Sequence, residues 1–423
     1  MRPTGRLHIG NYFGALVNWV KLQSDPANEC FFFVADWHSL TTDYADTSQI
    51  AQNTIEVATD FLAAGLDRKK SVIFLQSSVP EHAELHLLLS MITPLGWLER
   101  VPSYKEQIEN IKGKDLHTYG FLGYPVLQAA DIVMYGELGL DLVVPVGEDQ
   151  VAHVELNREV VRKFNFHFGL KIDRALYSDQ NMAAWNFLRR IAVGPFAALA
   201  ARPPDEQEQK TFESKVRDRI SSGGFLNFIT SDSIGPHAHF FTQNDALREP
   251  EVMLTQAARV PGTDGRKMSK SYGNAIELGE SDESIRAKTK VMMTDPARKR
   301  RSDPGDPDKC PVYDWHKLFS PPETLKWSAD GCRTAGIGCI ECKAAMADHL
   351  IKWIAPIREK REEYAADPDR VRQVLIEGSA RAQSTARETM ERVREAVFCR
   401  SEKRSSIPRV DVTKKLRRHI SLE

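Results

Sequence analysis

The sequence predicts an α/β protein, with a doubly wound parallel sheet followed by a mostly helical C-terminal domain. Three short apolar runs carry this prediction: FFFVAD (31–36), SVIFLQ (71–76) and DLVVPVG (141–147). Each has the composition of a strand buried on both faces, as in a parallel sheet. Helical patterns separate these runs, and strand–helix–strand spacing favours parallel pairing. From about residue 285 to 398 the apolar period is that of helices.

The stretch before the first strand is MRPTGRLHIGNYFG (1–14), a glycine-rich turn that runs into the helical spacing of Ile9, Phe13 and Leu16. Such a turn is a candidate phosphate cradle, because unpaired backbone N–H groups and the helix dipole favour an anion there. Cradles of this kind normally follow a buried strand, and no strand precedes this one. Either the turn has another role, or the chain starts too late.

A helix is expected between the first two strands. Asp46 and Gln49 form a possible capping box at its start. The residues on its apolar face are Ile55, Ala58, Phe61 and Leu62.

The C-terminal block and two other regions complete the organisation. Apolar residues at three- and four-residue steps around Met346 to Ile357 predict a helix, and Asp367-Pro368 predicts a break and restart. Residues 171–245 show no clear period. The tail after Cys399 is basic and weakly patterned, which predicts a solvated or disordered segment.

Composition excludes several classes of protein. The chain has 423 residues, 42% apolar and 27% charged, as in globular proteins that contain two or three domains. No apolar run approaches the ~20 residues of a membrane span. The formal net charge of -1 gives no overall attraction to nucleic acid, so such binding must rely on local patches. Six cysteines in so long a chain are not a disulfide framework, so the thiols are expected to be reduced or metal-bound.

A second informative stretch is PGTDGRKMSKSYGN (261–274), in which Lys267 and Lys270 alternate with Ser269 and Ser271. Taken alone, such a run is most often an exposed polar loop. Together with the opening turn it favours phosphate chemistry, because ammonium groups and hydroxyl donors suit the negative charge of a phosphoryl transition state.

Several motifs, in order along the chain, resemble one family. HIGN (8–11) and KMSKS (267–271) are similar to the two signature motifs of class I aminoacyl-tRNA synthetases. The stretch from YPVLQAADIVMYG to VELNREVVRKFN (124–165) resembles the bacterial tryptophanyl-tRNA synthetases. The motifs ADWHSLTT, MTDPARKRRSDPGDPDKCPV and APIREKREEY are similar to the same family, and the match covers roughly 1–170 and 248–398.

The resemblance implies an enzyme that forms tryptophanyl-adenylate. The carboxylate of L-tryptophan attacks the α-phosphate of ATP, pyrophosphate leaves, and the tryptophanyl group moves to the terminal ribose of tRNA(Trp). It also implies Mg²⁺ with the ATP, a homodimer and a cytoplasmic location. In the family a strand precedes the opening turn. We therefore expect Met1 to be internal to a longer natural protein, with a genuinely shortened form as the alternative. The missing strand would be central, and its loss would expose ladder groups.

The resemblance also implies a division of the chain into five parts. These are a Rossmann-like catalytic domain without its first strand (1–170), an insert of unknown fold (171–245), a return to the catalytic domain with the lysine-rich loop (246–284), a helical anticodon-binding domain with four cysteines (285–398) and a basic, disordered tail (399–423).

The resemblance assigns the ATP site. His8 lies near the phosphates, Val260 backs the base, and residues 267–271 close over pyrophosphate, with His8, Asn11, Lys267 and Lys270 catalytic. The implied ATP-binding residues are Arg2, Pro3, Thr4, Gly10, Asn11, Gly147, Glu148, Asp149, Val260, Lys267, Met268, Ser269, Lys270 and Ser271. For His8 alone, a cap or a core histidine is the alternative.

The amino-acid pocket separates tryptophan from tyrosine. Tyr124, Gln128 and Asp131 share one helical face, and a buried Asp can accept from an indole N–H or a phenol O–H. The same spacing is similar to tyrosyl-tRNA synthetase, the nearest alternative, whereas AADI with GEDQVAHVELNRE favours tryptophan. Asp131 is therefore assigned to the indole nitrogen, and Tyr124 with Gln150 to the substrate ammonium.

Four cysteines form a third group: Cys310, Cys332, Cys339 and Cys342. Four thiolates can hold one zinc ion or a 4Fe–4S cluster. Structural zinc sites usually show two close cysteine pairs, and only one is present. A subset of tryptophanyl-tRNA synthetases carries a cluster with nearly this spacing, so the cluster is preferred, with zinc or free thiols as alternatives.

Two further interpretations remain open at this point. The basic runs RKRR (298–301) and IREKREE (357–363) could be solvated helix faces or phosphate contacts. A protein of another class, a non-catalytic relative that binds tRNA or regulates, is favoured by the absent strand. The intact Lys267 and Lys270 disfavour it.

Overall fold

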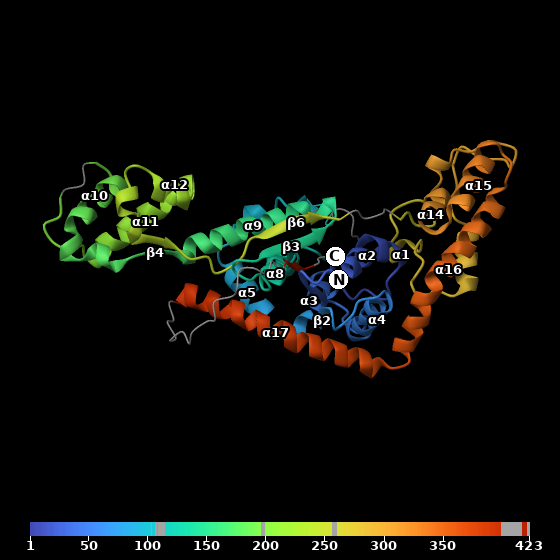
Figure 1. Cartoon of the computed structure of the whole chain (residues 1–423), viewed down its shortest axis with the longest axis horizontal. Helices are drawn as coiled ribbons and strands as arrows, with labels where there is room; N and C mark the ends of the chain where they lie inside the picture. The colour runs from blue at the N-terminus through green and yellow to red at the C-terminus, as the bar shows by residue number, and fades with distance from the viewer. Residues whose placement is uncertain are drawn as a thin grey trace.

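The computed structural model describes residues 1–102, 104–105, 108, 115–195, 199–255 and 260–398, and the backbone of 417–420. Its centre is a five-stranded sheet in the order β2-β1-β7-β3-β6, and each pair of neighbours is parallel (Figure 1). The strands are β1 (Asn28–Val34), β2 (Ser71–Leu75), β3 (Asp141–Val146), β6 (Pro250–Leu254) and β7 (Arg417–Ile420). The predicted α/β fold with a parallel sheet is confirmed, and the three apolar runs are β1, β2 and β3.

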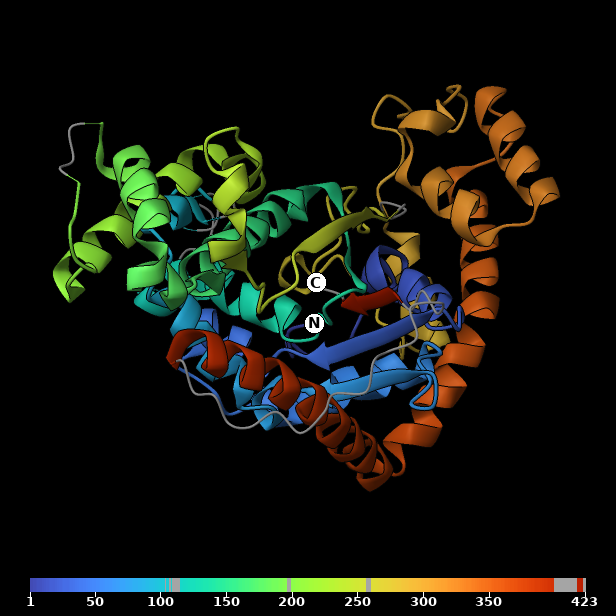
Figure 2. The same ribbon diagram turned by 60° about the vertical axis from the view of Figure 1, so that its left-hand side comes forward.

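Strand β7 fills the central position that the sequence leaves without an N-terminal strand. Its backbone pairs with residues 28–31 of β1 and 141–143 of β3. Further along β1, the ammonium group of Met1 donates to the carbonyl of Phe33 at 2.7 Å, and Ala35 N–H donates to the carbonyl of Met1 at 2.8 Å. The predicted disordered tail is therefore wrong at residues 417–420, and the rest of the tail lies outside the described residues. The N-terminus lies beside β7 in both ribbon views (Figures 1 and 2).

Helices cover the sheet. Those of the first half are α1 (Ile9–Asn11), α2 (Val17–Leu22), α3 (Asp36–Asp43), α4 (Ile50–Ala63), α5 (Glu81–Ser90), α6 (Leu95–Leu98), α8 (Tyr119–Val133) and α9 (Val151–Phe164), with π-helical turns at Tyr12–Leu16 and Asn165–Gly169. The predicted helix between the first two strands is α4, and Phe61 on its apolar face is fully buried. The predicted capping box is wrong: Gln49 is the N-cap residue and its side chain makes no capping bond.

The C-terminal helices are α13 (Asp282–Lys290), α14 (Pro311–Phe319), α15 (Pro322–Arg333), α16 (Cys339–Ala365) and α17 (Pro368–Phe398). The break at Asp367-Pro368 separates α16 from α17. Helix α17 returns along the edge strand β2, where a Cβ on Gly378 would overlap the carbonyl group of Ile73 (Figure 2). The hydroxyl of Ser379 accepts from Leu75 N–H at 3.3 Å. Helix α17 thus protects a sheet edge that would otherwise expose unpaired backbone groups.

Residues 170–243 form a separate small unit at one end of the molecule, opposite α15 (Figure 1). It consists of the antiparallel pair β4 (Leu170–Ile172) and β5 (Phe241–Gln243) and of helices α10 (Met182–Val193), α11 (Glu206–Gly223) and α12 (Phe225–Thr230). Its own core contains Trp185 and Phe212, both fully buried. The region without a clear sequence period therefore folds around local apolar contacts.

The larger core crosses the boundary that the sequence suggested near residue 285. Trp19 and Phe61 of the sheet region share one hydrophobic cluster with Trp315 of α14 and Leu350 of α16. Packing therefore connects the C-terminal helices to the first loop and to α4. Among the described residues, no helix is long and apolar enough to cross a membrane.

Candidate active site

The opening loop ends in a cap that fixes the orientation of His8. Its Nδ1 accepts a hydrogen bond from Asn11 N–H at 3.2 Å, and its backbone N–H donates to Oδ1 of Asn11 at 3.1 Å. Burial, and then the charge of Lys270, lower the pKa of His8 to about 4. The imidazole is therefore neutral at neutral pH, and the acceptor role of Nδ1 leaves the proton on Nε2. His8 is thus a cap, as in the alternative interpretation, and keeps one N–H donor for a ligand.

The second loop lies directly on the first. The ammonium group of Lys270 donates to the backbone carbonyls of Thr4 at 2.8 Å and Arg6 at 2.9 Å. Between these carbonyls, Gly5 has a φ of 101°, a conformation that glycine adopts without strain. Burial lowers the pKa of Lys270, although Glu277 and Asp60 oppose the shift. The structure thus brings the lysine-rich loop against the opening loop, which lies about 260 residues earlier in the chain.

Asn274 organises the second loop internally. Its Oδ1 accepts from Ser269 N–H at 2.7 Å, and its Nδ2 donates to Asp264 at 2.7 Å and to the carbonyl of Lys267 at 3.2 Å. From α14, the indole N–H of Trp315 donates to the carbonyl of Pro261 at 2.9 Å. The predicted loop therefore has a defined shape. The sequence analysis assigned no role to Asn274, although this residue ends the stretch PGTDGRKMSKSYGN.

The other predicted ATP residues surround this contact or the end of β3. Pro3, Val260 and Met268 are buried, whereas Lys267 and Ser271 are exposed. Arg2 makes a 3.5 Å hydrogen bond to the hydroxyl of Thr42. Gly147, Glu148 and Asp149 follow the carboxyl end of β3, where ligands bind in open parallel sheets, and both carboxylates are exposed. A Cβ on Gly10 would approach His8 to 2.9 Å, so this position requires glycine.

Asp131 lies in the last turn of α8 and is completely buried. Its Oδ2 accepts from Nε2 of His38 at 2.7 Å, and its Oδ1 accepts from Nδ1 of His82 at 2.6 Å. Nε2 of Gln76 lies 2.8 and 2.9 Å from the two oxygens. Burial alone would raise the pKa of Asp131, but the hydrogen bonds and charges of His38 and His82 lower it overall.

The sequence prediction for this carboxylate was incomplete, because it named no internal donors. His38 lies on α3, which follows β1. Gln76 comes directly after β2, and His82 lies in the first turn of α5. Polar residues at the carboxyl ends of parallel strands were the available signal. The other ring nitrogen of His82, Nε2, lies 2.6 Å from the hydroxyl of Tyr135, which is also fully buried.

Within the described part of the chain, the other three residues predicted to bind tryptophan share no hydrogen bond with one another. Tyr124 reaches His153, with 2.9 Å between its hydroxyl and Nε2. Gln128 is buried, and its Oε1 has no hydrogen-bond partner among the residues that the structure describes. Gln150 points to Asp149 at 3.3 Å. Among the described residues, no hydrogen bond joins Gln150 to Tyr124.

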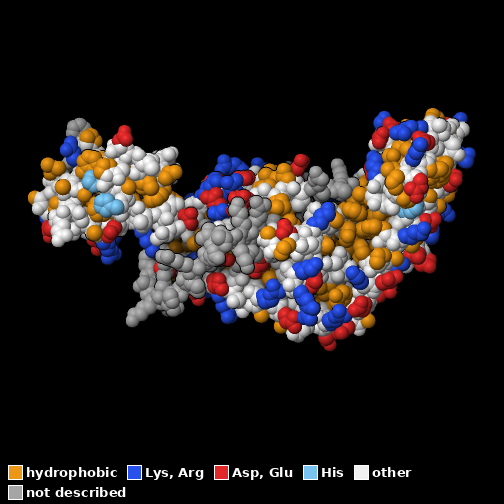
Figure 3. All heavy atoms as spheres, viewed as in Figure 1, with side chains coloured by type: hydrophobic (Ala, Val, Ile, Leu, Met, Phe, Trp, Pro, Cys, Tyr) orange, Lys and Arg blue, Asp and Glu red, His pale blue; other side chains and the backbone are white. Residues whose placement is uncertain are grey.

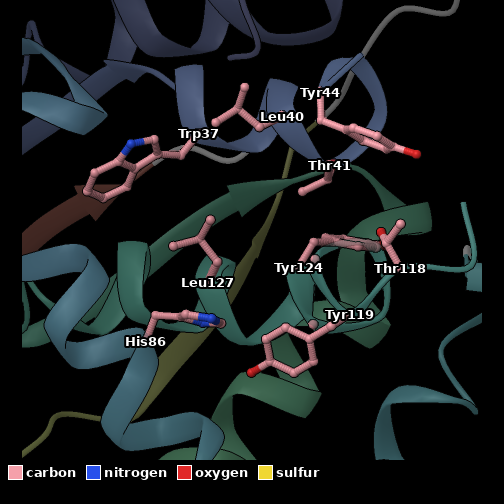
Figure 4. A pocket seen from close by; sticks show the side chains of 11 residues that line it. Trp37, Leu40, Thr41, Tyr44, His86, Thr118, Tyr119, Tyr124 and Leu127 are labelled. Atoms are coloured by element: carbon pink, nitrogen blue, oxygen red, sulfur yellow. The ribbon is translucent and has the colours of Figure 1, made fainter.

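A cavity of about 350 Å³ lies beside Tyr124. Figure 4 shows side chains of α3 on one side and of α5 and α8 on the other. Its lining residues are Trp37, Leu40, Thr41, Tyr44, His86, Thr118, Tyr119, Gly120, Gly123, Tyr124 and Leu127. Of the four predicted tryptophan-binding residues, Tyr124 alone lines this cavity. Its volume is in the range of small-molecule sites.

The four cysteines lie near one another at the junction of α14, α15 and α16. Burial first, and then the charges of Cys310, Cys332 and Cys339, raise the pKa of Cys342 to about 12. Nη1 of Arg298 lies 3.7 Å from the sulfur of Cys332. Within the described ranges, no three His, Cys, Asp or Glu side chains are arranged to hold a metal ion. The metal site therefore remains a prediction.

The basic runs are partly buried: Lys299, Arg300, Arg301 and Lys360 are exposed, whereas Arg298, Arg358 and Arg361 are held by other parts of the protein. Arg298 is buried and donates to the carbonyls of Arg301 and Ile337 at 3.0 and 2.7 Å. Arg358 donates to the carbonyl of Glu280 at 2.9 Å, and Arg361 is buried against α4. On the face drawn in Figure 3, charges of both signs are mixed over α16 and α17.

A parallel sheet together with an opening loop that is held by the second lysine of a KMSKS loop defines a class I aminoacyl-tRNA synthetase. A family model described as "tRNA synthetases class I (W and Y)" matches residues 1–183 and 237–354, and the chain belongs to this family. The matched ranges leave out most of the small unit with β4 and β5.

Individual relatives are similar over nearly their whole lengths. The "Tryptophan--tRNA ligase" of Ralstonia nicotianae is 46% identical over 402 residues, covering 94% of this chain and 96% of the relative. That of Thermotoga maritima is 44% identical, covering 94% and 97%. A crystal structure of tryptophanyl-tRNA synthetase from Campylobacter jejuni, complexed with ADP and tryptophan, has a TM-score of 0.67 and 28% identity, covering 94% of this chain and 98% of that chain.

Proposed function

We propose that this chain is a tryptophan–tRNA ligase. It activates L-tryptophan with ATP to give tryptophanyl-adenylate and pyrophosphate, and transfers the tryptophanyl group to tRNA(Trp) with release of AMP. The observation that carries this proposal is the contact of Lys270 with the carbonyls of Thr4 and Arg6, which joins both ATP motifs in one site. The relatives of nearly equal length carry the same activity in their names.

On the ATP side, the chain supplies positioning and charge. The tryptophan carboxylate attacks the α-phosphorus, the bond to the bridging oxygen breaks, and pyrophosphate leaves. Mg²⁺, when bound with ATP, would neutralise part of the phosphate charge. No protein nucleophile is required, so catalysis depends on orientation and on donors for the growing charge. Neutral His8 offers Nε2–H, and Lys267 and Lys270 offer ammonium groups. Gly147, Glu148 and Asp149, at the end of β3, hold the adenosine in this proposal.

On the amino-acid side, we assign Asp131 to the indole N–H and Tyr124 with Gln150 to the substrate ammonium. Asp131 already accepts from His38, Gln76 and His82. A substrate N–H therefore has to share Oδ2 with His38 or replace it. Trp37, the sequence neighbour of His38, lines the cavity. Gln128 completes this group, since its buried Oε1 has no hydrogen-bond partner within the described part of the chain.

Pyrophosphate exchange into ATP is expected to depend on tryptophan and to be negligible with tyrosine. A site that hydrogen-bonds its substrate rejects an analogue with the wrong group by about 10⁴-fold or more. The measurement is exchange at saturating ATP with each amino acid in turn. Equal rates with tyrosine would favour the tyrosyl alternative. Exchange with neither, by a folded protein, would favour the non-catalytic relative.

We further propose that the four cysteines hold a 4Fe–4S cluster, with zinc as the alternative. What supports this proposal is the type of donor, because four thiolates can hold one cluster, and the positive charge of Arg298 beside Cys332. The residues would be Cys310, Cys332, Cys339 and Cys342. Such a cluster would connect the start of α16 to the segment before α14 and would serve a structural role.

Protein purified without oxygen is expected to be brown and to contain about four irons and matching sulfide per chain. Cys339→Ser should lose iron and weaken tRNA charging, while tryptophan-dependent exchange continues, because both ATP loops lie elsewhere. Cys30→Ala, which removes a buried thiol of β1, is the matched control and should keep the iron. One zinc and no iron would contradict the cluster but keep the four ligands. Absence of any metal would contradict the site.

We also propose a cytoplasmic homodimer that binds tRNA(Trp). Large apolar side chains, each more than half exposed, gather on three helices that pack together, α5, α6 and α8. They are Leu87, Met91, Leu95 and Tyr119. Burial of such a patch between two copies would remove it from water. Sedimentation equilibrium tests the dimer, and a monomer at micromolar concentration would contradict it.

A further inference from the structure

A buried ion pair connects the C-terminal helices to the opening loop. Asp60 on α4 and Arg361 on α16 are both buried, and Nε of Arg361 donates to Oδ1 of Asp60 at 2.7 Å. The other carboxylate oxygen, Oδ2, accepts from the backbone N–H of Leu7 at 2.6 Å. A single carboxylate therefore holds both helix α16 and the residue that precedes His8.

Leu7 lies where the two ATP motifs meet. The carbonyl of Arg6, one residue earlier, accepts from Lys270 at 2.9 Å, and the carbonyl of Leu7 accepts from Leu278 N–H at 2.9 Å. The side chain of Arg6 also bonds Glu56 at 3.1 Å, and Glu56 pairs with Arg361. A displacement of Arg361 would therefore reach the backbone atoms that hold Lys270.

Helix α16 is also fixed to the segment that follows the lysine-rich loop. A Cβ on Gly279 would lie 2.9 Å from Cδ of Arg361, so the close approach of the Arg361 side chain requires glycine at position 279. One turn earlier, Arg358 donates to the carbonyl of Glu280 at 2.9 Å and to Asp282 at 2.6 Å. Two arginines of helix α16 thus contact the segment that follows the lysine-rich loop.

Stability alone is a weak reason for such a pair. Burial raises the pKa of Asp60 to about 6, although Arg361 and the N–H of Leu7 oppose the shift, which shows how costly the buried charge is. Buried ion pairs are often no more stabilising than packed apolar residues of similar volume. What the pair provides here is a fixed geometry between α16 and the loop.

We propose that Asp60 and Arg361 are positioning residues for adenylate formation, which couple the placement of α16 to the opening loop and Lys270. The inference rests on the proposed function. It implies that a displacement of α16 alters the rate of tryptophan activation. The first turn of α16 carries Cys339 and Cys342, which are not part of the ATP site.

The test is a double-mutant cycle with Arg361→Met, Asp60→Asn and the combined variant Asp60→Asn/Arg361→Met, in which neither side chain of the pair leaves a buried charge unpaired. Arg361→Met is expected to slow single-turnover adenylate formation by about 10–10²-fold, since misplacement by about 1 Å can cost 10². It should also weaken binding of a non-hydrolysable ATP analogue, with the KM for tryptophan unchanged. In the Asp60→Asn background the further effect of losing Arg361 should be much smaller, because it acts through Asp60.

The matched control is Arg286→Met, which removes another arginine pair to α16. Arg286 bonds Asp348 at 2.7 Å, and both side chains are about half exposed. This control should retain wild-type rates. Variants that melt at lower temperature but keep the wild-type rate and analogue affinity would overturn the proposal, as would equal losses in both backgrounds. If the wild type activates no amino acid, the proposed function fails, while analogue affinity still tests the coupling.

Discussion

Asp131→Asn is expected to raise the tryptophan concentration required for half-maximal pyrophosphate exchange by about 10²–10³-fold. Asp131 is an acceptor for three internal donors, and an asparagine would turn an N–H₂ group toward one of them and lose the charge. Loss of one partner in a buried, hydrogen-bonded charge pair costs about 2–5 kcal/mol. The ATP requirement should not change, because no ATP residue bonds Asp131.

Asp141→Asn is the control for this variant. Asp141 is a partly exposed carboxylate at the start of β3, 3.4 Å from Arg248, and lies at the opposite end of that strand from Gly147. Thermal melting of both variants separates loss of substrate binding from loss of fold. An unchanged tryptophan requirement in folded Asp131→Asn would show that the indole binds elsewhere, with the cavity beside Tyr124 as the next candidate.

Lys270→Met should slow single-turnover adenylate formation by about 10²–10³-fold, which is the usual effect of removing one transition-state donor. Its ammonium group now bonds the carbonyls of Thr4 and Arg6 and is half-buried, so it is already held beside the phosphate cradle. Affinity for a non-hydrolysable ATP analogue should change much less, because the charge that Lys270 meets grows in the transition state.

Lys343→Met provides the comparison, since Lys343 also donates to a backbone carbonyl, that of Lys290, at 3.1 Å. It should retain the wild-type rate of adenylate formation. Parallel loss of analogue affinity and rate in Lys270→Met would indicate ground-state binding in place of transition-state stabilisation. A wild-type rate would remove Lys270 from the catalytic residues.

Local sequence patterns predicted the elements that bury a continuous apolar run. Strands β1, β2 and β3 follow directly from FFFVAD, SVIFLQ and DLVVPVG, because strands covered on both faces need apolar residues throughout. The small unit at 170–243 escaped prediction, since its core forms from aromatic residues without a regular period, such as Trp185 and Phe212.

The sequence by itself determined the two ATP motifs, the parallel sheet and the family, because these depend on short runs of residues with one physical role. Only the tertiary structure decided what fills the centre of the sheet and what surrounds Asp131. Strand β7 pairs with β1 through backbone groups, which any residue offers, so no side-chain pattern reveals it. His38, Gln76 and His82 converge on Asp131 from separate elements, and Arg361 reaches Asp60 across about 300 residues. Such convergence depends on how helices pack on the sheet, which is a property of the folded chain and not of any one segment.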